Sequence, residues 1–121
     1  AGTHPFFRHY TMTIFKQKDW SSQTRRALTA TEIEANLALL KGWTLDTHSA
    51  PPTLEKTYRF ANYYETIAFV NALALVAHIQ DHHPDLSVHY DRCVVRLNTH
   101  DVQGISATDF DCASRFDALL A

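Results

Sequence analysis

The sequence has little of the features that mark several special classes of protein. It has two cysteines, Cys93 and Cys112, in 121 residues, too few for the disulfide framework of a small secreted protein. Its 11 lysines and arginines are outnumbered by 13 aspartates and glutamates, so no basic excess attracts nucleic acid or an anionic lipid surface. We therefore expect a reduced, cytoplasmic protein that binds neither nucleic acid nor a membrane.

Long hydrophobic runs are missing as well. The most apolar stretch, residues 66–79, is interrupted by Asn71 and is shorter than the roughly 20 apolar residues that span a bilayer. It favours a buried helix instead. Residues 1–12 lack the charged start, apolar middle and small-residue cleavage site of a signal peptide.

The length predicts a single domain, and the 45% hydrophobic content is enough for one core. We place this domain at residues 27–121. Residues 1–26 show no clean periodicity and are expected to form an N-terminal extension, disordered in part. Residues 1–12 end at the only methionine, Met12, and are either an upstream extension or an added sequence.

The first helix and hairpin follow from local signals. Thr29 and Glu32 fit a capping box, and apolar residues then recur at helical spacing until Gly42, where we expect the helix to end. Residues 43–48 and 54–60 alternate between apolar and polar side chains on either side of Pro51-Pro52. They predict a β-hairpin.

Two further helices have equally clear ends. Asn62 can cap a helix that stops near Asp81 or His82, because Pro84 disfavours helical geometry at the residue before it. Apolar residues surround most of this helix, which places it in the centre of the core. A last helix begins at Ser106 with a second capping-type start. Its apolar stripe consists of Phe110, Ala113, Phe116 and Leu120.

Residues 85–100 predict a second hairpin with a turn at Asp91-Arg92. This turn pairs apolar residues with one another on one face, which fixes the register. The pairs are Tyr90 with Cys93, Val88 with Val95 and Leu86 with Leu97. Cys93 then faces the core, where a small apolar role is expected.

The resulting element order is α-β-β-α-β-β-α. Strands with one apolar and one polar face need helices on one side only. The prediction is an α+β fold, a two-layer sandwich in which three helices cover one face of a four-stranded antiparallel sheet.

Histidine is the unusual residue type, with eight copies. Continued beyond the strands, the hairpin register places His100 opposite His83. His82 adjoins His83, and His78 lies one turn earlier on the same helical face. Three or four imidazoles are therefore expected at one edge of the sheet, together with the nearby carboxylates of Asp81, Asp101 and Asp109.

Two chemistries fit such a cluster. Clustered neutral imidazoles suit metal-free acid–base catalysis near neutral pH. Alternatively, His78 and His82 have the i, i+4 spacing of two zinc ligands, and His100 and Asp109 could complete a tetrahedron. Ile79 stands where the protease-type helix motif has its catalytic glutamate, which counts against that class of zinc enzyme.

The same residues carry a resemblance to a known family. The pattern consists of Asp81-His82-His83-Pro84, Tyr90, Asn98-Thr99-His100-Asp101 and Asp109, with Gly42-Trp43, residues 55–60 and Gly104-Ile105-Ser106 in support. In types and spacing it resembles the pterin-4a-carbinolamine dehydratase family, also known as the dimerisation cofactor of a homeodomain transcription factor. The resemblance covers about residues 28–120 and agrees with the predicted fold.

The resemblance implies a hydro-lyase that converts 4a-hydroxytetrahydrobiopterin to quinonoid dihydropterin and water. This step recycles tetrahydrobiopterin after aromatic amino acid hydroxylases, and it implies no cofactor and no metal. His82 and His100 would exchange the protons, His83 would hold the ring or assist, and Asp109 would orient a histidine. The substrate contacts would come from His78, Asp81, Pro84, Asn98, Thr99 and Asp101, with Trp43 near the mouth or simply in the core.

One position departs from the pattern, because the family often has a glutamate where this chain has His78. This keeps the metal alternative open. The resemblance also implies a homodimer or homotetramer. Some family members bind a transcription factor through a helix face, which here would be the stripe of Phe110, Phe116 and Leu120; the alternative for that stripe is packing and self-association.

Overall fold

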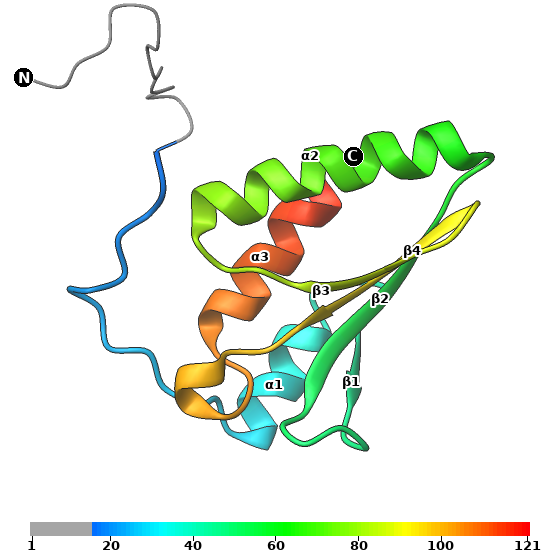
Figure 1. Ribbon diagram of the computed structural model, residues 1–121. Helices are drawn as coiled ribbons and strands as arrows, with labels where there is room; N and C mark the ends of the chain where they lie inside the picture. Colours follow the sequence, from blue (N-terminus) through cyan, green and yellow to red (C-terminus); the bar gives the residue numbers. More distant parts are fainter. Residues whose placement is uncertain (1–15) are drawn as a thin grey trace, which may run out of the picture.

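The structure is a computed structural model that describes residues 16–121. Its elements are α1 (Ala30–Leu37), β1 (Thr44–Asp46), β2 (Thr53–Arg59), α2 (Tyr63–Gln80), β3 (Asp85–Val88), β4 (Arg92–Leu97), a short 3₁₀ helix (His100–Val102) and α3 (Ala107–Ala118). The strands form one antiparallel sheet in the order β1-β2-β4-β3. The helices pack on one side of this sheet (Figure 1). The predicted α+β fold and its element order are confirmed.

The start of α1 is as predicted, but its end is not. The Thr29 side chain and Glu32 form both hydrogen bonds of the capping box. The helix ends at Leu37, well before Gly42, because the following turns are closed by shorter i→i+3 hydrogen bonds, such as that from the Leu40 N–H to the Leu37 carbonyl. Gly42 has a φ of 87° and turns the chain into β1.

Helix α2 begins at its predicted cap and ends in a tight turn. The Asn62 side chain accepts from the Glu65 N–H. At the other end Asp81 has the left-handed φ of 46°, and the His82 N–H donates to the Ala77 carbonyl at 3.1 Å, which is a Schellman-type ending. The helix thus stops at Gln80, about where Pro84 requires it to stop.

The placement of α2 in the centre of the core was wrong. Phe69, Leu73 and Ala77 are buried, whereas Leu75 is 40% exposed and Tyr64 is 82% exposed. In a two-layer fold the sheet covers only one side of a helix, so an apolar circumference does not by itself bury the whole helix.

The register of the second hairpin was also wrong, by two residues. Leu86 pairs with Val95, and Val88 pairs with Cys93. The turn is longer than predicted because the β3–β4 pairing ends in a four-residue loop, closed by a hydrogen bond from the His89 N–H to the Arg92 carbonyl. A shift of two residues preserves the faces of both strands, so Cys93 and Val95 are buried as predicted.

The described part of the expected N-terminal extension contacts the domain. The Lys18 N–H donates to the Ile79 carbonyl at 2.7 Å, and the Trp20 Nε1–H donates to the Gln80 carbonyl at 2.7 Å. These carbonyls belong to the last turn of α2, where a helix leaves acceptors without partners. In residues 16–121 no helix combines the length and the apolar character needed to cross a membrane.

Asp117 on α3 ties the hairpin of β1 and β2 to the helical layer. Its carboxylate accepts from the Trp43 Nε1–H at 3.1 Å, from the Lys56 ammonium at 2.8 Å and from the Tyr58 hydroxyl at 2.5 Å. Tyr58 is only 4% exposed, and burial together with Asp117 raises the pKa of its hydroxyl. The tyrosine therefore depends on this carboxylate for its hydrogen bond.

We expect Asp117→Ala to lower the free energy of unfolding by about 2 kcal/mol, because the buried Tyr58 hydroxyl loses its acceptor. Urea denaturation measures this change. The matched control is Asp111→Ala on the same helix, which removes an exposed ion pair with Arg115 worth at most about 0.5 kcal/mol. Equal effects of the two substitutions would contradict the role assigned to Asp117.

The two thiols lie in the core, and their burial contributes to the pH dependence of stability at alkaline pH. Burial raises the pKa of Cys93 and raises that of Cys112 to about 12. Above about pH 8.5 the unfolded chain loses these protons while the folded chain keeps them. We therefore expect the free energy of unfolding to fall as the pH rises from about 9 to 12, and to fall less in Cys112→Ala. Denaturation at several pH values tests this.

Candidate active site

A pocket of about 370 Å³ lies at the end of the sheet where α2 leads into β3 and β4 leads into the 3₁₀ helix. It is lined by Arg25, Asp81, His82, His83, Pro84, Asp85, Asn98, Thr99, His100 and Asp101. The volume is in the range of small-molecule sites, about 300–1,000 Å³. Three of the predicted histidines thus share one pocket.

The three histidines meet in one pocket even though the predicted register of the second hairpin was wrong. Asp81, not His83, is the residue that the observed register would place opposite His100. The gathering follows from the antiparallel direction of β3 and β4, which brings the start of one strand and the end of the other to the same end of the sheet.

The centre of the site is a buried pair of His82 and Asp109. The Nε2 atom of His82 lies 2.6 Å from the Asp109 carboxylate, and the two side chains are 8% and 0% exposed. His82 reaches this position because the left-handed Asp81 turns the chain away from the axis of α2. Asp109 is the third residue of α3, and its carboxylate also completes the capping box with Ser106.

Both oxygens of the Asp109 carboxylate have hydrogen-bond partners. One oxygen faces His82, and the other accepts from the Thr99 hydroxyl at 2.7 Å and from the Ser106 N–H at 2.9 Å. The Ser106 hydroxyl lies 2.7 Å from that of Thr99. These three partners replace the hydrogen bonds to water that the carboxylate loses on burial.

This arrangement fixes which nitrogen of His82 carries the proton. A carboxylate only accepts hydrogen bonds, so the proton of neutral His82 lies on Nε2 and Nδ1 keeps its lone pair. Nδ1 has no partner among residues 16–121 and is not fully buried. Asp109 therefore holds the imidazole of His82 through Nε2, and Nδ1 is the ring nitrogen that is left with an open lone pair.

Apart from Thr99, which is 1% exposed, the other pocket residues are more accessible than His82. His83 and His100 are exposed, and both line the same pocket. Asp81 accepts from the Gln17 amide at 3.2 Å. Pro84 and Asn98 are partly buried. Imidazoles that reach solvent exchange protons readily near neutral pH, so the pocket combines one buried, oriented histidine with two accessible ones.

His78 is not part of this pocket, contrary to expectation. It is exposed on α2, where its Nδ1 lies 3.4 Å from the Gln17 amide nitrogen. The predicted zinc pair required His78 and His82 on one helical face, but the helix ends at Gln80 and His82 turns inward. Across the described residues, no three His, Cys, Asp or Glu side chains gather as metal ligands.

Trp43 also lies away from the pocket. Its indole is 5% exposed, packs edge-on against Tyr58 and donates to Asp117. It is absent from the pocket lining. Of the two interpretations of this residue from the sequence, the structure shows the core aromatic.

Sequence reasoning missed two lining residues, Arg25 and Asp85. Asp85 follows Pro84 directly, and its nearness to the histidine pair was the available signal. Arg25 lies in the segment expected outside the domain, and no local pattern marks it. A second pocket of about 390 Å³ lies beside Arg25 against the start of α3, but its lining contains no histidine.

The orientation of His82 can be tested with Asp109→Asn. The Ser106 N–H and the Thr99 hydroxyl both need an acceptor, so the amide oxygen of the variant is expected to face them and its NH₂ group to face His82. This forces the proton of His82 onto Nδ1. Nitrogen NMR of the imidazole should report the Nε2–H form in the natural chain and the Nδ1–H form in the variant. An unchanged Nε2–H form would contradict this geometry, and Asp111→Asn is the control.

The chain is similar to proteins of known family. A sequence model described as pterin 4 alpha carbinolamine dehydratase matches residues 26–119. A protein of Paracidovorax citrulli is 68% identical over 109 residues, covering 90% of this chain and 94% of that protein. One of Stenotrophomonas maltophilia is 57% identical over 90 residues, covering 71% of this chain and 76% of its own length. Both carry the provisional name pterin-4-alpha-carbinolamine dehydratase.

Solved structures agree with this. A crystal structure of a transcriptional coactivator/pterin dehydratase from Brucella melitensis has a TM-score of 0.72 and 27% identity, covering 78% of this chain and 99% of its own. A pterin dehydratase-like RuBisCO assembly factor of the alpha-carboxysome has a TM-score of 0.56 and 26% identity, covering 64% of this chain and 88% of its own. The chain belongs to the pterin-4-alpha-carbinolamine dehydratase family.

Proposed function

We propose that this protein dehydrates a 4a-hydroxytetrahydropterin, such as 4a-hydroxytetrahydrobiopterin, to the quinonoid dihydropterin and water. The observation that carries the proposal is the buried His82–Asp109 pair, which opens into a pocket shared with His83 and His100. Membership of the dehydratase family supports it. The physiological setting that we propose is the recycling of tetrahydrobiopterin after an aromatic amino acid hydroxylase.

The reaction needs two proton transfers. The bond between C4a and the hydroxyl oxygen breaks, and that oxygen takes a proton to leave as water. The ring nitrogen N5 loses its proton and forms a double bond to C4a. Atoms and charge balance without any change of oxidation state, so the step itself calls for no redox cofactor.

We assign the base to His82 and the acid to His100. His82 lines the pocket and is held through Nε2, which leaves the Nδ1 lone pair for the substrate proton, and the Asp109 carboxylate would stabilise the imidazolium that forms. His100 is exposed to solvent and lines the same pocket, where a positioned imidazole can serve as a general acid. His83 would hold the ring, and Asp81, Pro84, Asn98, Thr99 and Asp101 would supply further contacts to the substrate.

The alternative of a coactivator that binds through the last helix is less well supported. Phe110 and Phe116 are 6% and 0% exposed and belong to the core. Only Leu120 of the proposed stripe is exposed, so the stripe offers little surface to another protein. A homodimer or homotetramer and a cytoplasmic location stay predictions from the sequence.

Stopped-flow measurement of 4a-hydroxytetrahydropterin dehydration tests the proposal. We expect the natural chain to accelerate the reaction in the presence of a chelator, and His82→Ala to lower kcat by about 10²–10⁴-fold, the usual contribution of a positioned acid or base. The matched control is His89→Ala, which changes an exposed histidine in the β3–β4 turn and should leave the rate unchanged.

Two outcomes would contradict this proposal. A folded natural chain without any acceleration would remove the dehydratase function. Activity that is lost with the chelator and restored by zinc would make the histidines metal ligands and replace the acid–base mechanism.

A further inference from the structure

Arg25 brings a cationic side chain into the pocket from outside the matched family region, which begins at residue 26. Its side chain is 20% exposed, and its Nη2 lies 2.5 Å from the Asp101 carboxylate. Asp101 follows His100 directly in the 3₁₀ helix. The ion pair therefore lies on the wall of the pocket beside one of the three histidines.

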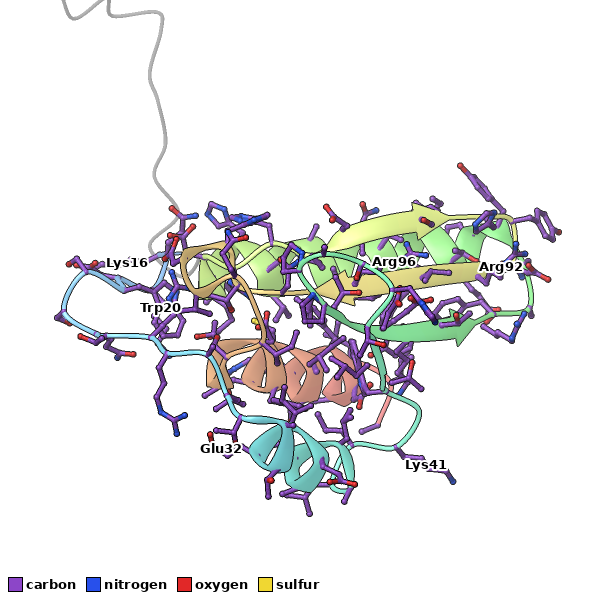
Figure 2. All side chains as sticks on the ribbon, turned by 90° about the horizontal axis from the view of Figure 1, so that it is seen from below. Lys16, Trp20, Glu32, Lys41, Arg92 and Arg96 are labelled. Atoms are coloured by element: carbon purple, nitrogen blue, oxygen red, sulfur yellow. The ribbon has the colours of Figure 1, made fainter. Side chains whose placement is uncertain are left out.

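The N-terminal segment holds Arg25 in this place. The guanidinium lies 5.4 Å from the centre of the Trp20 ring, a cation–π contact. Trp20 is fixed in turn by its hydrogen bond to the Gln80 carbonyl, and Lys18 adds another to Ile79. Figure 2 shows Trp20 at the end of the molecule opposite Arg92 of the β3–β4 hairpin. Arg25 is thus positioned before any ligand arrives.

The pair also keeps hydrogen-bonding capacity. An arginine has five N–H donors, and among residues 16–121 Arg25 uses its guanidinium in one hydrogen bond, the one to Asp101. The second oxygen of Asp101 has no partner among the same residues, and this side chain is 69% exposed. A donor and an acceptor consequently stand side by side on the pocket wall.

A pterin presents the complementary pattern. Along its pyrimidine edge the 4-oxo group accepts a hydrogen bond, while N3–H and the 2-amino group donate. We propose that Arg25 and Asp101 bind this edge, with the Arg25 guanidinium donating to the 4-oxo group and the Asp101 carboxylate accepting from N3–H and the 2-amino group. The inference rests on the proposed function, and it makes Arg25 a substrate-binding residue and Asp101 the residue that recognises the 2-amino group.

This assignment separates two tasks within the pocket. The ion pair holds the end of the ring system that does not react, and the histidines exchange protons at C4a and N5. Contacts of the first kind are present in both the ground state and the transition state, so their loss raises KM and leaves kcat nearly unchanged. A purely structural ion pair would change neither constant once the protein is folded.

The experiment compares two stable ligands, 7,8-dihydropterin and 7,8-dihydrolumazine. The second has a 2-oxo group in place of the 2-amino group, which would face the Asp101 carboxylate as an acceptor. By calorimetry we expect the natural chain to prefer dihydropterin by about tenfold or more, the effect of one charged hydrogen bond. Asp101→Asn should narrow this preference, because its amide can also donate.

The kinetic variants are Arg25→Ala, Arg25→Lys and Arg26→Ala. We expect Arg25→Ala to raise KM about tenfold with little change in kcat, and Arg25→Lys to recover part of the loss. Arg26 is the matched control, because this neighbouring arginine pairs with Glu32 at the start of α1 and does not line the pocket. Melting temperatures of all variants separate folding from binding.

Three outcomes decide the matter. If the natural chain accelerates dehydration while Arg25→Ala leaves KM unchanged or Asp101→Asn leaves the ligand preference unchanged, this inference is overturned and the dehydratase stands. If Arg25→Ala lowers only the melting temperature, the ion pair is structural and the inference is likewise overturned. If the natural chain shows no dehydration, the proposed function and this inference fall together.

Discussion

The hydrogen bonds of one buried carboxylate, that of Asp109, hold the functional end of the protein together. They join three segments that are distant in the sequence: His82 after α2, Thr99 after β4 and Ser106 at the start of α3. A buried polar group needs such partners, because burial removes its hydrogen bonds to water. The same carboxylate caps α3 and holds the imidazole, so the start of this helix and the position of His82 depend on one group.

The end of α2 determines what that carboxylate meets. The left-handed Asp81 turns His82 inward, while His78, which a continuous helix would have placed on the same face, stays exposed. The carbonyls of Ile79 and Gln80 are satisfied by the backbone of Lys18 and the indole of Trp20. This helix end therefore serves as a scaffold for the histidine site on one side and for the N-terminal segment on the other.

The three histidines of the pocket have different surroundings. One imidazole is buried and oriented by a carboxylate, and two are accessible to solvent. Acid–base chemistry benefits from such inequality, because the same residue type can then hold a proton at one position and release it at another. The ion pair of Arg25 and Asp101 forms another part of the pocket wall, to which we assign substrate binding.

Much of this could be predicted from local sequence. The caps of α1, α2 and α3, the two hairpins and the gathering of His82, His83 and His100 follow from short-range hydrogen bonds, alternation and strand direction. Only the tertiary structure showed the β3–β4 register and the exposure of Leu75. It also showed that His78 and Trp43 do not line the pocket. It alone also brought Arg25 to Asp101. These features depend on turn length, on which side of a helix is covered and on contacts between residues far apart in the chain, none of which leaves a periodic signal in the sequence.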